Sequence, residues 1–180
     1  MKRTITLVAA ILMLALCITG CATTTQQKDV KVKLSDTLQT LKDKMVDEGY
    51  IPKKDVTNTE MSPVKQKGTD GKEKEYGGYL SVGAVEGVRY AFKYNNSDVN
   101  VELYRYDSKK NTDLSKKIID EVKNYGYFTY EGTDEKVDAT LSADDNFLLI
   151  YQDSSTEKKN ENKKADAEKF FKEYKAKWFT

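Results

Sequence analysis

The sequence predicts an α+β domain with an antiparallel sheet of about five to six strands and two to three helices packed mainly on one face. Strand-like segments follow one another as hairpins in the middle of the chain, and only three segments show helical periodicity. Runs of hairpins with few helices are typical of this class. The chain has 180 residues, which suits a single domain. A domain of roughly this size buries about 70% of its unfolded surface, so it can fold without disulfides.

The first twenty residues have the pattern of an export signal. Lys2 and Arg3 precede an apolar run from Ile5 to Ile18 in which only Thr6 is polar. A membrane-spanning helix needs about 17 to 25 apolar residues, so this run is too short to remain as an anchor. We therefore expect residues 1–20 to be a signal peptide that is removed.

The segment from Ile18 to Cys21 reads Ile-Thr-Gly-Cys and resembles the lipobox of bacterial lipoproteins. The resemblance implies cleavage between Gly20 and Cys21, and a diacylglyceryl group, with palmitate-type chains, on the Cys21 sulfur. Cys17 does not fit, because Leu16 stands where the lipobox has a small residue. The implied product is a lipoprotein on the extracytoplasmic face of the cell membrane, or at the outer membrane of a double-membraned host.

Residues 21–33 are predicted to be the lipidated N-terminus and a flexible tether, followed by one domain over residues 34–180. The tether is polar or alternately charged and shows no periodicity. Each buried methylene contributes about 0.8 kcal/mol, and one acyl chain binds membranes only marginally. The two chains on Cys21 would therefore carry the attachment, because the three lysines of the tether are too few.

A first helix is predicted over residues 36–48, with Ser35 or Asp36 as its N-cap and Gly49 at its end. Its apolar stripe is Leu34, Leu38, Leu41 and Met45. Residues 52–78 are then predicted to be a long, polar and mobile loop. The alternatives are short strands around Val56 or Val64, or a binding loop.

A hairpin follows, with strands over residues 88–94 and 99–104 joined by a turn at residues 95–98. Apolar and polar residues alternate in both strands, and the turn consists of Asn, Ser and Asp. The preceding residues 77–87 contain four glycines, which is typical of a bulged strand or a turn-rich segment.

The C-terminal half predicts two more helices and three strands. The helices cover residues 112–124 and 160–177; Gly126 ends the first. The strands cover residues 127–130, 136–142 and 147–151, and the last of these is apolar on both sides, as expected at the centre of a sheet. The apolar stripe of the final helix is Ala167, Phe170, Phe171, Tyr174 and Trp178.

The sequence predicts no catalytic residue, no metal site and no cofactor. It contains no histidine, which excludes Ser-His-Asp and Cys-His nucleophiles and imidazole metal ligands. Neither a phosphate-binding glycine loop nor an EF-hand has the required spacing. Glu86, Glu102 and Glu131 near strand ends are the carboxylates from which a glycoside hydrolase pair would come.

The hairpin offers a candidate binding surface formed by Arg89, Tyr104, Arg105 and Tyr106. Arg89 and Arg105 are the only arginines after the signal, and a guanidinium prefers a bidentate partner. That partner is either a carboxylate of the fold, such as Glu102, or an acidic ligand. The chain has twelve tyrosines, which suit either a contact surface or packing within an antiparallel sheet.

The sequence therefore predicts a membrane-anchored extracytoplasmic lipoprotein with a non-catalytic binding domain. The Gly-Ala-Val-Glu-Gly, Val-Glu-Leu-Tyr and Asp-rich turn segments are similar to uncharacterised small surface lipoproteins of bacteria. The expected partners are the bilayer, through acylated Cys21, and an envelope protein or glycan. Without the signal the chain has 28 basic and 29 acidic residues, a charge of −1 that argues against nucleic acid.

Two alternatives remain. One is an extracytoplasmic hydrolase that acts on cell-wall or carbohydrate material through paired carboxylates. The other is an accessory subunit of a membrane complex, in which the aromatic segment from Phe170 to Trp178 inserts into a groove of the partner.

Overall fold

The computed structural model describes residues 33–68 and 71–176. The predicted signal peptide, Cys21, nearly all of the tether and Trp178 lie outside the described residues. None of the helices in the described ranges is both long enough and apolar enough to cross a membrane.

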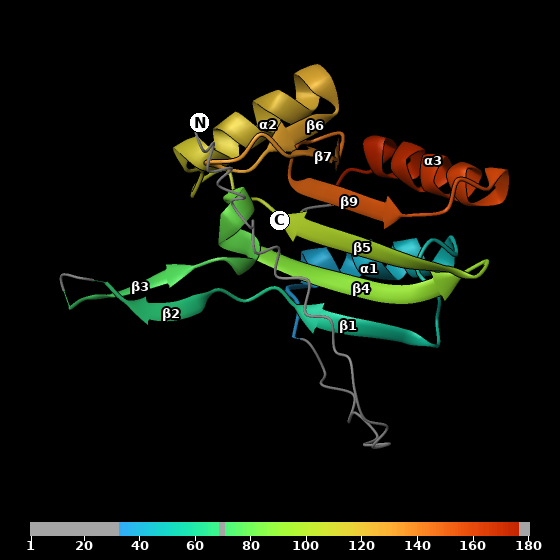
Figure 1. Cartoon of the computed structure of the whole chain (residues 1–180), viewed down its shortest axis with the longest axis horizontal. Helices are drawn as coiled ribbons and strands as arrows, with labels where there is room; N and C mark the ends of the chain where they lie inside the picture. Colours follow the sequence, from blue (N-terminus) through green and yellow to red (C-terminus); the bar gives the residue numbers. More distant parts are fainter. Residues whose placement is uncertain (1–32, 69–70, 177–180) are drawn as a thin grey trace, which may run out of the picture. The chain divides into compact units, whose positions relative to one another are not determined.

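A five-stranded antiparallel sheet forms the centre of the domain (Figure 1), which confirms the α+β class. Its spatial order is β1-β4-β5-β9-β8. The strands span Val56–Glu60 (β1), Glu86–Tyr94 (β4), Ser97–Arg105 (β5), Thr140–Leu141 (β8) and Phe147–Asp153 (β9). The β4–β5 hairpin turns through Asn95 and Asn96, both with positive φ, a combination that Asn tolerates better than most residues.

The remaining strands form two small two-stranded sheets. The structure also corrects the prediction of a loop over residues 52–78. That segment contains β1, β2 (Val64–Lys67) and β3 (Glu73–Tyr76) rather than one long loop. β2 and β3 pair only with each other, as do β6 (Tyr127–Thr129) and β7 (Lys136–Asp138). The alternative of short strands around Val56 or Val64 is therefore the correct one. No local pattern favours it over a loop, because β1 is polar and pairs with β4, about thirty residues away.

The helices form where caps and periodicity predict them. α1 (Asp36–Asp47) begins at Ser35, whose hydroxyl accepts from the Leu38 N–H. α2 (Asp113–Tyr125) begins with a capping box between Thr112 and Ser115 and ends at Gly126. α3 spans Lys158–Glu173. Residues 77–87 contain the short 3-10 helix η1 (Gly78–Val82) before β4 begins, so the turn-rich alternative is correct and the bulged strand is not.

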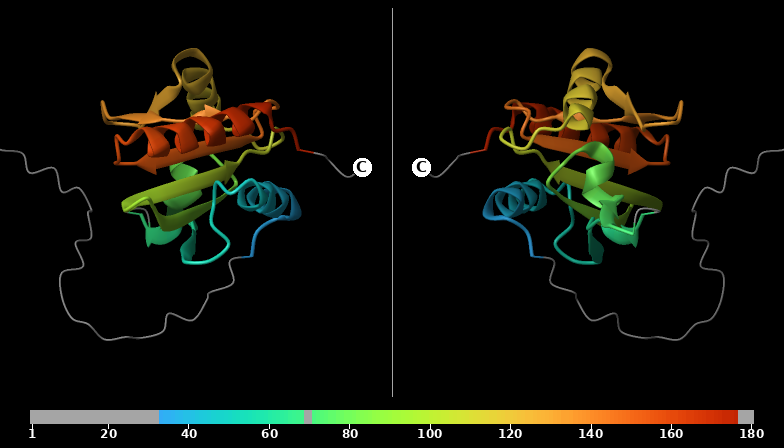
Figure 2. Two further views of the ribbon diagram at one scale, coloured as in Figure 1. Left: turned by 90° about the vertical axis from the view of Figure 1, so that its right-hand side faces the viewer. Right: turned by 90° about the vertical axis from the view of Figure 1, so that its left-hand side faces the viewer.

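Both faces of the sheet are covered, so the domain has two apolar cores. α1 and α3 pack on one face, and α2 and η1 pack on the other. Figure 2 shows α1 (blue) beside the green strands, well apart from α2 at the top of the domain. Two helices thus share one face as predicted, and the third covers the opposite face.

β9 is buried on both faces but is not the central strand. Phe147, Leu149 and Tyr151 face the core under α1 and α3, whereas Leu148 and Ile150 face the core under α2. β5 occupies the middle of the sheet, and β9 lies between β5 and the two-residue strand β8.

Candidate functional site

The two tyrosines of the predicted hairpin surface lie in the core under α2. Tyr104 and Tyr106 are 1% and 2% exposed. The Tyr104 hydroxyl donates to Glu102 Oε2 (2.8 Å), and the Tyr106 hydroxyl donates to the Val82 carbonyl (3.2 Å). Burial raises the pKa of both hydroxyls, and Glu102 raises that of Tyr104 further. The prediction of a binding surface is therefore wrong for both tyrosines.

Arg89 pairs with Glu102, its direct neighbour across the β4–β5 ladder. Arg89 Nε donates to Glu102 Oε1 at 2.7 Å. The Glu102 side chain is 7% exposed, whereas the Arg89 side chain is 47% exposed and still meets water. The geometry confirms an ion pair within the fold, which satisfies the guanidinium without an acidic ligand.

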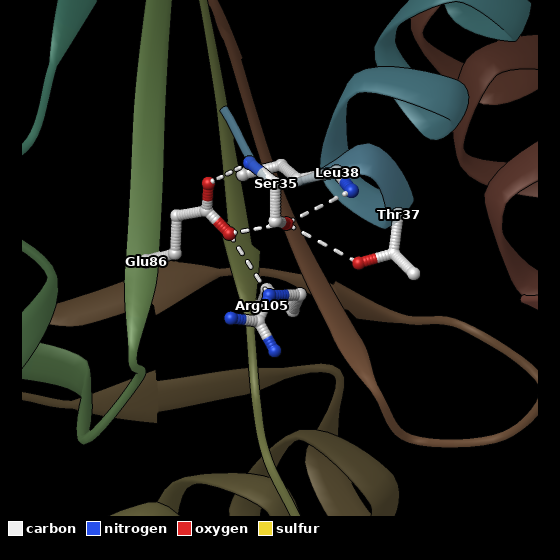
Figure 3. Close-up of polar contacts among 5 residues, drawn as sticks. All are labelled: Ser35, Thr37, Leu38, Glu86 and Arg105. Atoms are coloured by element: carbon white, nitrogen blue, oxygen red, sulfur yellow. Dashed lines mark hydrogen bonds and ion pairs between the residues drawn. The ribbon is translucent and has the colours of Figure 1, made fainter. Parts of the chain in front are cut away.

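Arg105 takes part in a second polar cluster, with Glu86 and Ser35 (Figure 3). Arg105 Nε donates to Glu86 Oε2 at 2.9 Å. The Ser35 backbone N–H and hydroxyl both donate to Glu86, each at 2.6 Å. Ser35 is also the N-cap of α1, so this cluster fixes the first turn of that helix to β4 and β5.

These contacts assign structural roles to two of the three predicted carboxylates. Glu86 receives three hydrogen bonds, and Glu102 receives bonds from Arg89 and Tyr104. Glu131, the third, lies exposed in the turn between β6 and β7. Residues 33–68 and 71–176 contain no group of three acidic or cysteine side chains that could hold a metal ion.

A third polar cluster joins the β4–β5 hairpin to the start of α3. Asn160 is 1% exposed, and its Nδ2 donates to Asp153 Oδ2 at 2.8 Å. The Ser97 hydroxyl and the Ser155 N–H donate to Asp153 Oδ1. Partial burial would raise the pKa of Asp153, but these three hydrogen bonds outweigh it and lower the pKa.

The aromatic side of α3 belongs to the domain's own core. Ala167 and Phe171 are fully buried, and Tyr174 is 8% exposed and packs edge-on against Phe147. This agrees with the predicted apolar stripe and contradicts, for Phe171 and Tyr174, the alternative in which the segment from Phe170 to Trp178 inserts into a groove of a partner. A groove of about 320 Å³ remains between α1 and the end of α3, lined by Thr40, Phe170, Tyr174 and neighbours.

The β2–β3 hairpin has no such packing, and we call residues 64–67 and 73–76 the arm. All eight of these residues are exposed, on both faces of the hairpin. Val64 and Tyr76 are directly paired across the strands and are 57% and 45% exposed. Among the other large apolar side chains in the described ranges, only Tyr125 is also exposed, at 65%.

The two ends of the arm are held close together where it joins the domain. The Tyr79 N–H donates to the Met61 carbonyl at 2.7 Å. Gly78 has φ +55°, and a Cβ there would lie 2.3 Å from the Met61 carbonyl oxygen. The positive φ and the close carbonyl oxygen both require a glycine at position 78. The base of the arm is therefore held in one conformation, although the strands of the arm are exposed.

The arm carries opposite charges on its two strands. Lys65 and Lys67 on β2 lie opposite Glu75 and Glu73 on β3, and Lys65 Nζ is 3.8 Å from Glu75 Oε1. Val64 and Tyr76 lie on the other face together with the paired Gln66 and Lys74, because side chains alternate along a strand. The signal for this feature in the sequence is weak, since Tyr76 is the sole aromatic residue of a polar stretch.

No family model matches the chain, and neither a curated protein nor a solved structure matches it.

Proposed function

We propose that the protein is a lipoprotein anchored through Cys21 on the extracytoplasmic face of the membrane, and that its domain binds an envelope protein through the arm. The observation that carries the binding proposal is the exposure of both faces of the arm. Every other strand that is longer than three residues pairs within the five-stranded sheet.

The anchoring proposal rests on the lipobox-like segment that ends at Cys21. Two acyl chains on one thioether suffice for stable attachment, which one chain does not provide. The structure is compatible with this arrangement at the start of the domain. The Ser35, Glu86 and Arg105 cluster holds the beginning of α1 to the sheet. The tether that leads from Cys21 would therefore join the domain at a residue that is fixed to the sheet.

The arm needs a contact that the described domain does not supply. An isolated two-stranded hairpin is marginally stable in water, and it gains stability from a third strand or a packed face. The arm offers both features to a partner, namely the apolar pair of Val64 and Tyr76 and two open strand edges. An extended protein segment can use both at once, which is why we favour a protein over a glycan.

The hydrolase alternative has less support from the geometry. A pair of catalytic carboxylates needs one group that can be protonated and one that can reach the sugar. Glu86 and Glu102 are instead each hydrogen-bonded to an arginine of the hairpin, and Glu102 is buried.

Replacing Cys21 with Ala tests the anchor, and Cys17→Ala is the matched control. We expect the Cys21→Ala chain to lose incorporation of labelled palmitate and to leave the membrane fraction. The Cys17→Ala chain should be labelled and retained like the wild type. Unchanged labelling and retention of the Cys21→Ala chain would overturn the proposal.

Polar substitutions in the arm test the binding surface. A Val64→Ser/Tyr76→Ser chain should fold normally but lose the envelope proteins that the tagged wild-type chain retains. Tyr125→Ser is the control, because Tyr125 is also an exposed tyrosine but lies on α2. The proposal is wrong if both variants retain the same proteins, and retention of a glycan instead would reject the protein partner.

A further inference from the structure

The outer edge of β1 is an open border of the five-stranded sheet (Figure 1). β1 pairs with β4 on one side, and no strand of the described ranges pairs with its other side. Residues 57–60 are all exposed. An open edge presents backbone donors and acceptors that can pair with a further strand.

The register with β4 shows which backbone groups of β1 point outward. The Met61 N–H donates to the Gly87 carbonyl at 2.9 Å, and these residues continue the β1–β4 register. Bonded residues alternate along an antiparallel ladder, so the backbone groups of Thr59 and Thr57 also face β4. Those of Asn58 and Glu60 therefore face away from the sheet.

The arm has outward-facing backbone groups too, but its charges oppose pairing with a second copy of the same strand. The Gly68 N–H donates to the Lys72 carbonyl, so residues 65 and 67 face outward on β2, and residues 73 and 75 on β3. Antiparallel pairing of β2 with another β2 would place Lys65 opposite Lys67. The same pairing of β3 would place Glu73 opposite Glu75, and like charges directly opposite are destabilising.

The other free edges are short. β8 has two residues, and β6 and β7 have three each. Natural proteins protect open edges with short strands, lysines, prolines or bulges. β1 has five residues, no lysine, no proline and an uninterrupted register with β4. Among the strands of the described ranges, β1 therefore has the least protected edge.

We propose that β1 pairs with β1 of a second copy of this chain, antiparallel and about a twofold axis at Asn58. Asn58 then lies opposite Asn58 of the other copy, Thr57 opposite Thr59, and Val56 opposite Glu60. No like charges face each other, and paired threonines are favourable across strands. The interface is isologous, as in most homodimers, and the sheet continues from one copy into the other. This self-association goes beyond the proposed function and does not depend on the arm.

Oxidative cross-linking of the full chain in cells tests the register. In an Asn58→Cys chain the two introduced sulfurs meet at the twofold axis, and paired strands bring their Cα atoms within disulfide range. We expect a covalent dimer of twice the chain mass. The wild type controls for Cys17 and Cys21, and Lys169→Cys places an exposed thiol on α3; neither should give this dimer.

Two proline substitutions in β1 distinguish the loss of edge pairing from the loss of fold stability. Glu60→Pro removes an outward N–H, which an edge strand tolerates, so the Asn58→Cys dimer should disappear while the thermal midpoint is kept. Thr59→Pro removes an N–H that faces β4 and should lower the midpoint instead. The proposal is overturned if Asn58→Cys yields no dimer, if Glu60→Pro leaves the dimer intact, or if the cross-linked product contains another protein.

Discussion

The five-stranded sheet and the arm are both antiparallel, yet they differ in almost every other respect. The sheet is covered on both faces by helices and contributes twelve of the 28 buried apolar side chains of the described ranges, more than the three helices together. The arm buries none of its eight residues. Burial of apolar surface is the main source of folding free energy, so the sheet determines the fold. Two exposed apolar side chains on a projecting hairpin are more readily explained by a contact outside the domain.

The largest expected difference between the two regions is the cost of removing an aromatic ring. Phe147→Ala empties a fully buried position in the core under α1 and α3 and should cost about 3–5 kcal/mol of the free energy of unfolding. Tyr76→Ala in the arm should change it by about 0.5 kcal/mol or less. Urea unfolding of both variants measures the two changes in free energy. Similar midpoints for the two variants would contradict the claim that the sheet, and not the arm, stabilises the fold.

Ion pairs should show the same contrast at a smaller scale. Arg89→Met leaves the buried Glu102 carboxylate without its positively charged partner, with only the Tyr104 hydroxyl still donating to it, and should cost about 1–3 kcal/mol. The Arg89→Met/Glu102→Gln chain should recover part of this loss, because no buried charge remains. Lys65→Met breaks an exposed pair in the arm and should cost about 0–1 kcal/mol. Equal costs for Arg89→Met and Lys65→Met in urea unfolding would contradict this account.

The cap of α1 should contribute less again. Ser35→Ala removes the N-cap hydroxyl and its hydrogen bond to Glu86, and we expect a loss of about 1 kcal/mol. Thr40→Ala, in the interior of the same helix, removes only a bond to the Asp36 carbonyl and should be nearly neutral. The midpoint of thermal unfolding should therefore be lower for Ser35→Ala than for Thr40→Ala. The reverse order would mean that the Ser35, Glu86 and Arg105 cluster does not stabilise the start of α1.

The smallest effect is expected in the pH dependence of stability. The lowered pKa of Asp153 means that its carboxylate stabilises the fold above its unfolded pKa of about 3.9. This contribution is lost as the pH falls through the lower pKa of the folded state. Asp153→Asn should be less stable than wild type at neutral pH and should lose less stability between about pH 4 and pH 2. Parallel curves over this range would show that Asp153 makes no such contribution.

Much of the fold is predictable because its signals are local. Ser35, Thr112 and Gly126 mark helix ends at the positions where the helices begin or end. Alternation in residues 88–94 and 99–104 predicts the hairpin. The strand around Val56 is predicted only as an alternative to a loop, because Thr57 and Thr59 are ordered by their pairing with Ala91 and Arg89, which no local pattern records.

The site was less predictable for a related reason. Leu103 and Tyr104 point to opposite faces of β5, yet both are buried because helices cover both faces. The sequence cannot show that α2 and η1 cover Tyr104, since those elements are distant along the chain. The pairing of Arg89 with Glu102 was foreseeable as one of two possibilities, because both lie in the same hairpin.

Amide hydrogen exchange of the full chain tests the central claim, that the sheet determines the fold and the arm binds a partner. The chain is compared in native membranes and after purification from them. Exposed segments exchange quickly and gain protection when they are bound. We predict that the amides of residues 64–67 and 73–76 are protected in membranes and lose this protection on purification, while those of β4, β5 and β9 stay protected in both. Equally fast exchange of the arm in the two states would contradict the account.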